Sequence, residues 1–389
     1  SYLHHLKEGL IVTNMNDQVC WGLGIINFEY FLGVAAAAVL LIAPAYLHHK
    51  KEINDVVGIV ELLAVNAVVM CLLYIITDIG RPDRFWHLMP FLGGRLNLPS
   101  SILAWDVIMF NGYLAISLHI PGYLLYKEYL GEKPHSIYYL PIVFVAMGWA
   151  IVIPTVSAFL FSGFGGRPYW NSAILVPRFL MSSFSCGPAL LIIIFTMVNR
   201  FTEFKVTSLV FDYLKKILRI TMPLGLFLLG CEIFKELYTD SLHSSSAKYI
   251  YFGLHGHSML VPYMWSSIVM LIIATVIFLV PNYYNNSFLL NAACLLTNVG
   301  IWVEKAAGMV LPGFTPTPLG DIVEYLPNLG ELLVSLGVLS IGLLIFTAMT
   351  KVALGIRTGK LRLSDDERIK KEYFKKQTRH FLKARKLSI

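Results

Sequence analysis

Apolar stretches of about 20 residues follow one another along almost the whole chain, and this pattern limits its fold more than any other feature. Each stretch is long enough to cross the roughly 30 Å hydrocarbon core of a bilayer as a helix. Backbone N–H and C=O groups find no water there, so runs of this length fold as helices that satisfy their own hydrogen bonds. We expect spanning helices at about 20–46, 54–77, 101–126, 137–162, 174–199, 216–238, 256–280, 288–312 and 326–350.

The composition supports the same fold class. Of the 389 residues, 14% are charged, compared with roughly 25% in an ordinary soluble domain. The two-residue alternation that marks a membrane β-barrel is absent from the apolar stretches. The sequence therefore predicts an all-α integral membrane protein with about nine transmembrane helices, within a range of eight to ten.

Lysine and arginine are distributed unevenly over the connections between these stretches. Of the 31 in the chain, 22 lie in four connections, 50–51, 127–133, 200–219 and 351–386. Cytoplasmic loops hold such an excess, so we expect an outer N-terminus and an inner C-terminus in the cytoplasmic membrane.

The two ends of the chain follow from this orientation. Residues 1–19 form an outer segment without the pattern of a signal peptide. Residues 351–389 form a basic cytoplasmic tail, which carries 13 of the 31 lysines and arginines. The basic pI therefore describes the tail and does not indicate a nucleic-acid-binding groove.

The connection between the second and third apolar stretches, residues 77–105, is rich in functional side chains. It holds Asp78, Arg81, Trp86, His87 and Trp105, with Gly and Pro residues that fix its backbone. A loop with such a composition indicates a binding site or a docking surface for an outer partner. The alternative is that its arginines only contact lipid head groups.

Ten charged side chains fall within the apolar stretches. An Arg, Lys or Asp at the centre of a membrane helix costs about 2.5 to 3.5 kcal/mol, so these groups must line helix interfaces or form pairs. The ten are Glu29, Glu61, Asp106, Arg178, Glu232, Lys235, Glu236, Glu304, Lys305 and Glu331. Among them Glu61, Glu232, Glu304 and Lys305, together with His257, are candidates for a proton path, and structural ion pairing is an equally good interpretation.

Carboxylates and amides also gather near the outer boundary. Asn27 and Glu29 lie in the first stretch and Asp106 in the third, roughly 8 to 14 Å below that boundary at 1.5 Å per residue, with Asp78 above them. A lipid-soluble quinol needs an apolar slot with a hydrogen-bond acceptor that takes a proton. We therefore predict that Glu29, Asp78 and Asp106 are catalytic.

Other site classes are disfavoured by the pattern of ligands. Most of the 11 histidines lie in loops or at chain ends, without the facing pair that a membrane haem needs, and the five cysteines form no Cys-x-x-Cys pair. We expect no haem, iron–sulfur cluster or metal ion to be bound by this chain. No phosphate-binding loop or hydrolase motif is present in the sequence.

Three sequence elements resemble one membrane-protein family. Residues 78–86 (Asp-Ile-Gly-Arg-Pro-Asp-Arg-Phe-Trp), Trp21 with the small residues 33–38, and Trp302-Val-Glu304-Lys305 before a Pro-rich loop are similar to the NrfD/polysulfide reductase membrane subunits. Within this family the chain looks most like the DsrP- or Hme-type subunit of the membrane complex tied to dissimilatory sulfate reduction.

The resemblance implies a fold and a site. It implies two four-helix bundles, here 20–162 with a quinone site and 163–350. It implies menaquinone or menaquinol near the outer face, no redox cofactor held by this subunit, a ferredoxin-like iron–sulfur subunit outside, and other membrane and haem subunits. The residues that it suggests for quinone binding are Trp21, Asn27, Arg81, Trp86, His87 and Trp105. Members often have a histidine in the first span, where this chain has Asn27 and Glu29.

The function predicted from these observations is that of a quinone-interacting subunit of a respiratory redox complex. It would oxidise menaquinol, or reduce menaquinone, and exchange electrons with the outer iron–sulfur partner, with proton translocation as a further possibility. Two alternatives remain open at this point. The chain is a proton- or ion-conducting subunit, or it is a membrane anchor without a redox site of its own.

Overall fold

The computed structural model describes residues 1–47, 51–89, 93–94, 96–238 and 244–363. Within these ranges the chain is all-helical, and the only extended pairing is one isolated bridge between Leu254 and His257. Nine helices of the described residues are long and apolar enough to cross a membrane. The predicted all-α, multi-pass membrane fold is thereby confirmed.

The helices and helical turns follow one another in this order: α1 (Tyr2–Glu8), η1 (Leu10–Val12), α2 (Leu23–Ala37), α3 (Val39–Leu47), α4 (Lys51–Asp78), η2 (Pro82–Leu88), α5 (Ile102–Tyr129), η3 (Ser136–Tyr138), α6 (Leu140–Ser162), η4 (Pro168–Trp170), α7 (Leu175–Phe201), α8 (Ser208–Tyr238), α9 (Ser244–Phe252), α10 (Val261–Leu279), α11 (Pro281–Tyr284), α12 (Ser287–Lys305), η5 (Ala306–Val310), η6 (Leu311–Gly313) and α13 (Leu329–Arg357).

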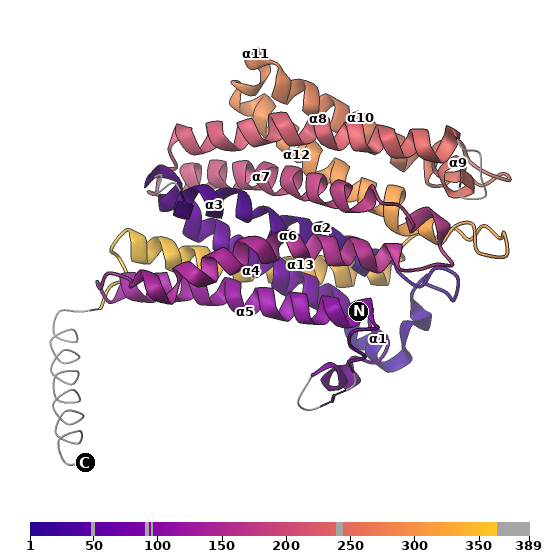
Figure 1. Cartoon of the computed structure of the whole chain (residues 1–389), viewed down its shortest axis with the longest axis horizontal. Coiled ribbons are helices and arrows are strands. Elements are labelled where there is room, and N and C mark those ends of the chain that lie inside the picture. The colour runs from indigo at the N-terminus through magenta and orange to yellow at the C-terminus, as the bar shows by residue number, and fades with distance from the viewer. Residues whose placement is uncertain (48–50, 90–92, 95, 239–243, 364–389) are drawn as a thin grey trace.

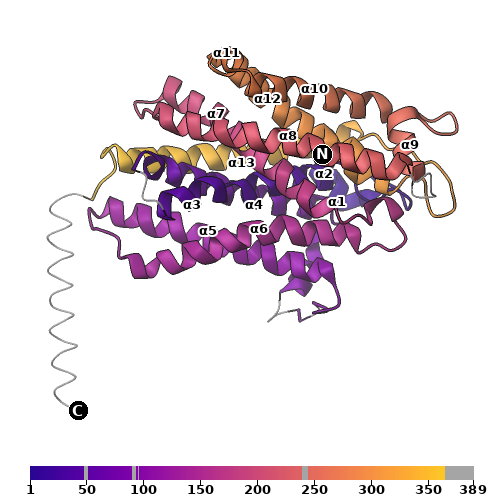
Figure 2. The ribbon, with the colours of Figure 1, turned by 45° about the horizontal axis from the view of Figure 1, so that its top comes forward.

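The long helices run side by side along the long axis of the molecule (Figure 1). One end, which we call the N-terminal face, carries α1, η2, α9 and the loop 314–328. The other end, the C-terminal face, carries the connections 130–135, 202–207 and 280–286. A turned view shows the same separation of the two ends (Figure 2).

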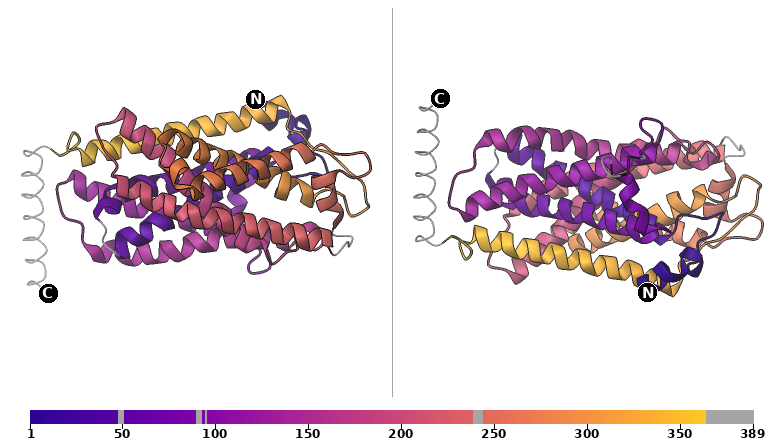
Figure 3. Two further views of the ribbon diagram at one scale, coloured as in Figure 1. Left: turned by 90° about the horizontal axis from the view of Figure 1, so that it is seen from above. Right: turned by 90° about the horizontal axis from the view of Figure 1, so that it is seen from below.

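Helices α2 and α4 lie at the centre of the assembly. In their most apolar 18-residue stretches, 78% of the residues of α2–α3 and 83% of those of α4 are buried, whereas only 11% are buried in α13. Most of α13 therefore faces outward, where lipid would contact its leucines. Views from above and below show α7, α8, α10 and α12 on one side of this centre (Figure 3).

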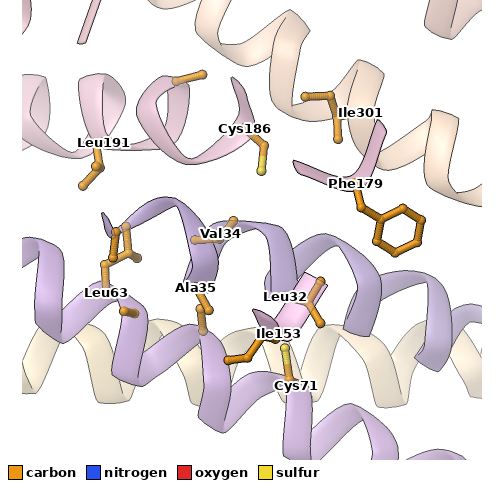
Figure 4. Packing of buried hydrophobic residues seen from close by; sticks show 14 of the residues in the cluster. Leu32, Val34, Ala35, Leu63, Cys71, Ile153, Phe179, Cys186, Leu191 and Ile301 are labelled. Carbon is orange, nitrogen blue, oxygen red and sulfur yellow. The ribbon is translucent and has the colours of Figure 1, made fainter. Parts of the chain in front are cut away.

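Helix α2 joins the two sides of the molecule. Leu32, Val34 and Ala35 of α2 lie between residues of α4 and residues of α7 (Figure 4). The approach of α7 is close because Gly187 has no side chain, and a Cβ atom there would collide with Ala37. The predicted division into 20–162 and 163–350 stays a prediction, and α13, which it assigns to the second bundle, packs against α4, α2 and α5.

Three helices differ from the predicted spans. The first span is broken at Ala38 into α2 and α3. The eighth changes after Lys305 from an α-helix into the π-helical turn η5, where Gly308 and Met309 accept hydrogen bonds from Tyr169 and Trp170 side chains, both at 2.8 Å. Helix α13 continues to Arg357, so part of the predicted tail is helical, and residues 364–389 lie outside the described ranges.

Candidate functional site

A small cavity lies at the N-terminal face, where α2 begins, α4 ends and α13 begins. Its volume is about 20 Å³, which is room for about one water molecule. We call it the Asp78 cavity, after the predicted catalytic residue in its wall. It is lined by His5, Leu10, Thr13, Met15, Leu23, Gly24, Tyr74, Thr77, Asp78, Glu331, Val334 and Ser335.

Asp78 is held against the first turn of α2. The backbone N–H of Ile25 donates a hydrogen bond to its carboxylate. Helix α2 begins at Gly22 without a side-chain cap of its own, and the N-terminus of a helix attracts a negative charge. A Cβ atom on Gly24 would lie 2.7 Å from Asp78 Oδ1, so glycine is needed for this approach. Asp78 thus caps α2 and forms part of the cavity wall.

A second carboxylate, that of Glu331, enters the same cavity from α13. Tyr325 donates to Glu331 Oε1 at 2.5 Å, and the backbone N–H of Leu23 donates to the Tyr325 hydroxyl at 3.1 Å. Glu331 also completes a capping box with Asn328 at the start of α13. Two acidic side chains from distant parts of the chain therefore meet at the N-terminus of α2.

The segment 1–15 covers this cavity. The Ser1 hydroxyl donates to Gly330 O at 3.0 Å, Asn328 Nδ2 donates to Val12 O at 2.7 Å, and the Asn14 N–H donates to Glu331 Oε2 at 3.0 Å. His5 is buried beneath the segment. Burial lowers the pKa of His5 from its ordinary value, and the negative charge of Glu331 partly opposes this shift.

The predicted residue Asn27 lies one layer deeper and connects three helices. Its amide nitrogen donates to Ser335 Oγ at 2.7 Å, and its amide oxygen accepts from Trp302 Nε1 at 2.8 Å. Because Ser335 also lines the Asp78 cavity, Asn27 fixes part of the cavity wall from behind. Nearby, the Tyr30 hydroxyl donates to Asn298 Oδ1 at 2.7 Å, and a second polar link joins α2 to α12.

The other two predicted catalytic residues form a separate, deeper group. Glu29 is 1% exposed, and among the described residues neither of its carboxylate oxygens has a hydrogen-bond donor. The charged groups that act on Glu29 are Lys305 and Asp106. Asp106 accepts from Ser157 Oγ at 3.2 Å, and the Lys305 ammonium lies 3.4 Å from the centroid of the Phe179 ring.

A buried ion-pair triad lies near Lys305. Arg178 of α7 pairs with Glu232 of α8 and with Glu304 of α12. A cavity of about 50 Å³ adjoins the triad, and its wall includes Arg178, Glu304 and Ser185. The charges that act on Lys305 include Glu304 and Arg178 of this triad as well as Glu29, so Lys305 lies close to both polar groups.

The aromatic and basic residues predicted for quinone binding lie elsewhere. Arg81 pairs with Asp83 at 2.9 Å, and Trp86, 48% exposed, contacts the ring of His87 in the same loop. Trp105 is exposed and donates to Pro99 O at 2.9 Å. None of these residues lines the Asp78 cavity as it is described.

Trp21 is also outside this cavity. It stacks on Trp170 with a centroid distance of 5.6 Å, and Phe161, Phe164 and Phe314 contact it edge-on. This aromatic cluster joins the segment before α2 to α6, to η4 and to the chain after η6. Its position favours a packing role for Trp21, and the assignment of this residue to quinone binding stays a prediction.

The two remaining proton-path candidates lie at opposite faces. Glu61 is buried towards the C-terminal face and accepts from the Tyr46 hydroxyl at 2.9 Å. His257 lies in a loop of the N-terminal face, with Nδ1 3.4 Å from Glu324 Oε2. Burial alone would raise the pKa of Glu324. Hydrogen bonds from Met259, His257 and Tyr249 stabilise the carboxylate more strongly, so its pKa lies below the ordinary value. Neither residue joins the groups around Lys305.

Sequence reasoning does not select His5, Glu331 or Tyr325 as site residues. His5 lies in a polar segment with no apolar periodicity, and its burial depends on contacts with α13, more than 300 residues away. The Asn-x-x-Glu pattern at 328–331 is a usable signal, because it marks a helix start with a carboxylate in its first turn. The pattern does not show that the Glu331 carboxylate meets the start of α2.

The Asp78 cavity brings together several groups that are able to exchange protons. Two carboxylates, a tyrosine hydroxyl and an imidazole lie within or beside one cavity, whose other walls are largely apolar. Within the described ranges, no group of three or more His, Cys, Asp or Glu side chains is placed to hold a metal ion. The expectation that this chain binds no metal or haem stays a prediction.

Several curated proteins are similar to this chain over most of its length. A selenate reductase subunit of Mesobacillus selenatarsenatis is 22% identical over 386 residues, covering 88% of this chain and 87% of its own. A protein of Halobacterium salinarum that is named as a dimethyl sulfoxide reductase membrane subunit is 22% identical over 380 residues (90% and 86%). The Hdr-like menaquinol oxidoreductase integral membrane subunit of Archaeoglobus fulgidus is 23% identical over 366 residues (90% and 89%).

The predicted family resemblance is confirmed by a family model. The model described as polysulphide reductase, NrfD, matches residues 11–311. This range begins inside the segment that covers the Asp78 cavity and ends beside the π-helical turn after Lys305. The chain therefore belongs to the NrfD family of membrane proteins.

Proposed function

We propose that this chain is the quinone-interacting membrane subunit of a redox complex and that it oxidises menaquinol at the Asp78 cavity. The observation that carries the proposal is the meeting of Asp78 and Glu331 in one cavity at the N-terminal face. A relative with the same span of similarity is named as a subunit of a menaquinol oxidoreductase, which supports the choice of substrate class. By the distribution of lysine and arginine, the N-terminal face is the extracytoplasmic one.

The reaction requires two electrons and two protons to leave the quinol. Asp78 is the first proton acceptor, because its carboxylate lines the cavity and is fixed by the Ile25 N–H. Glu331 is the second acceptor, with Tyr325 holding its carboxylate in place. An iron–sulfur partner would take the two electrons, and menaquinone would return to the lipid.

The cavity must enlarge before a naphthoquinol ring can enter it. Its volume of about 20 Å³ fits little more than one water molecule. The segment 1–15 is held over it mainly by hydrogen bonds to the start of α13, and Leu3 and Ile11 of this segment are exposed. Displacement of a segment held in this way costs less than opening the apolar interface between α2 and α4. We therefore propose entry beneath segment 1–15.

The partner docks, in this proposal, on the loop that follows α4. This loop begins directly after Asp78, the last residue of α4. An iron–sulfur cluster of a partner docked there would therefore lie close to the quinol head. Trp86 is half-exposed and Met89 is partly exposed on this loop, and Trp105 is partly exposed in the first turn of α5 that follows it. Aromatic residues are the commonest anchors of protein interfaces. The family resemblance suggests a ferredoxin-like iron–sulfur subunit, further membrane and haem subunits, and a link to sulfate reduction.

The deeper group of Glu29, Asp106 and Lys305 has a supporting role in this scheme. Glu29 and Asp106 lie below the Asp78 cavity in the spans α2 and α5. They are placed to take protons from the site if oxidation is coupled to proton translocation. The Glu29 carboxylate is the better candidate, since its oxygens lack donors among the described residues.

The test compares Asp78→Asn with Asp212→Asn in the intact complex. Asp212 is an exposed aspartate of α8 near the C-terminal face, which pairs with Lys215. A positioned proton acceptor contributes roughly 100-fold or more to rate, so we expect at least a tenfold loss of menaquinol oxidation in Asp78→Asn and wild-type rates in Asp212→Asn. Wild-type turnover in both variants would remove Asp78 from the mechanism.

A second candidate function is proton conduction through the helices α7, α8, α10 and α12. It is favoured by the buried Arg178 triad and by the adjoining cavity of about 50 Å³, which has room for about three or four waters. Vesicles containing the purified chain, loaded with a pH-sensitive dye and given no quinone, test this function. Proton flux that is lost in Glu304→Gln supports conduction, and vesicles as tight as protein-free ones exclude it.

A further inference from the structure

We propose that His5 transfers protons from the Asp78 cavity to the water at the N-terminal face. The proposal rests on the proposed function, because it names the group through which protons leave that same site. His5 acts on the carboxylates of the cavity and does not need to touch the quinol.

The first observation is which side chains α1 buries. Of its seven residues, Tyr2–Glu8, only His5 is buried, with 7% of its surface exposed, while Leu3 is 74% exposed and Leu6 is 46% exposed. Burial of apolar surface is the main favourable term in packing, and it would turn the leucines inward. The orientation of α1 is therefore set by polar contacts, which place an imidazole in the cavity.

The second observation is how α1 is held in this orientation. Ser1 donates to Gly330 O and Tyr2 donates to Ile76 O, so the start of α1 is tied to both α13 and α4. Gly330 makes room for the imidazole, because a Cβ atom there would lie 3.2 Å from His5 Nε2. These contacts keep the ring in the wall of the cavity, with 7% of the residue's surface exposed.

The third observation is the set of charged groups around the ring. Glu331 of α13 faces His5, Asp78 of α4 lines the same cavity, and His4 lies beside it on α1. His4 is exposed to the surroundings. Burial lowers the pKa of His5, although Glu331 opposes the shift, so the ring is neutral and free to accept a proton at neutral pH.

The proton transfer returns every group to its starting state. A proton taken from a quinol hydroxyl by Asp78 passes to the unprotonated ring nitrogen of His5, directly or through the single water for which the cavity has room. The imidazolium then loses the proton on its other nitrogen to outside water. Asp78 returns to the carboxylate, and His5 returns to the neutral ring after it reorients or exchanges tautomers.

The experiment uses the intact complex with menadiol, a naphthoquinol head without a prenyl tail, and measures turnover across pH. The variants are His5→Gln, His5→Ala and the matched control His4→Gln. We expect the two His5 variants to lose about tenfold or more in turnover with an unchanged KM, and His4→Gln to match the wild type. The fall in wild-type turnover on the acid side, as His5 becomes protonated, should disappear in His5→Gln.

Chemical rescue separates proton transfer from a structural role. Imidazole added to His5→Ala should restore turnover in proportion to the concentration of its neutral form, which a loss of packing would not do. Failure of imidazole to restore the rate, or a wild-type rate and pH profile in His5→Gln, overturns the proposal. If the wild-type protein binds menadiol but does not oxidise it, the proposed function is wrong. That result differs from a failure of the His5 proposal alone, in which the wild type oxidises menadiol and the His5 variants do so equally well.

Discussion

The hydroxyl of Tyr325 donates a 2.5 Å hydrogen bond to Oε1 of Glu331 and at the same time accepts the backbone N–H of Leu23 at 3.1 Å. One phenol thus connects the loop before α13, the first turn of α13 and the first turn of α2. A carboxylate at the N-terminus of a helix is stabilised by the exposed N–H groups there. The contact fixes Glu331 in the wall of the Asp78 cavity and fixes the start of α2.

Replacing Tyr325 by Phe should destabilise the protein and disturb the cavity together. The change leaves a buried carboxylate oxygen and a backbone N–H without this partner. Loss of a hydrogen bond to a charged group costs about 1.5 to 3 kcal/mol, and thermal unfolding in detergent would measure the loss. Tyr238→Phe is the control. Tyr238 is exposed at the end of α8, and its contact with Phe234 is a stack of the two rings that Phe would keep. Equal melting temperatures for both variants would contradict the assigned role.

Replacing Gly24 by Ala should displace Asp78 without removing it. A Cβ atom at Gly24 would lie 2.7 Å from Asp78 Oδ1, closer than van der Waals contact allows. Elsewhere in a helix the same change stabilises by about 0.4 to 1 kcal/mol. Gly148 of α6 offers that control, since no atom outside its own stretch of helix backbone lies within 4 Å of an added Cβ. We expect menaquinol oxidation to fall several-fold in Gly24→Ala and to stay constant in Gly148→Ala. Activity retained in Gly24→Ala would show that the position of Asp78 is not critical.

The number and type of the helices could be predicted because a membrane restricts the backbone so strongly. A run such as 54–77 has one stable solution in lipid, a helix, and α4 covers that run from Lys51 to Asp78. The break at Ala38 and the π-helical turn after Lys305 could not be predicted in the same way. They depend on contacts made after folding, among them the hydrogen bonds from Tyr169 and Trp170 to the carbonyls of the turn.

The site could be predicted only in part. Asp78 is predictable because it opens a connection rich in charged and aromatic side chains, above the level of Asn27 and Glu29, and the structure places it in the cavity wall. Depth along the helices groups Glu29 and Asp106 with Asp78, but it does not say which neighbouring helix each side chain faces. In the structure the charges that act on Glu29 are those of Lys305 and Asp106, and Asp106 accepts a hydrogen bond from Ser157. His5 is buried against the trend of hydrophobicity, so no pattern of apolar residues indicates it.

Replacing Trp86 by Ala should weaken binding of the proposed iron–sulfur partner without changing the Asp78 cavity. Trp86 projects from η2 with 48% of its surface exposed and contacts only His87 among aromatic rings of the described residues. An aromatic anchor at an interface contributes about 2 kcal/mol, which is a roughly 30-fold change in Kd. Co-purification of the partner is the measurement, and Phe288→Ala at the C-terminal face is the control. Unchanged recovery of the partner would place its docking surface elsewhere.

Lower pH should loosen the segment 1–15. The ordinary pKa of histidine is 6.5, and burial lowers the pKa of His5 below this value in the closed segment. The open segment therefore binds more protons between these two values, and the closed form loses stability as the pH falls through this interval. Amide hydrogen exchange of residues 1–15, corrected for the intrinsic rate at each pH, should show falling protection on the acid side. His5→Gln should remove most of this dependence, and protection that is constant from neutral to acid pH in the wild type would exclude the linkage.

Removing the charge of Arg178 should test what the buried triad does. Arg178→Met leaves Glu232 and Glu304 in the membrane interior without the cation that pairs with both, and breaking a buried pair in this way costs about 3 to 5 kcal/mol. The combined variant Arg178→Met, Glu232→Gln, Glu304→Gln removes all three charges, and it should regain most of that stability because no ion is left unpaired. If the triad only holds α7, α8 and α12 together, the combined variant will oxidise menaquinol and move protons like the wild type. If the triad conducts protons, the combined variant will be stable and will oxidise menaquinol, but its vesicles will show no proton movement.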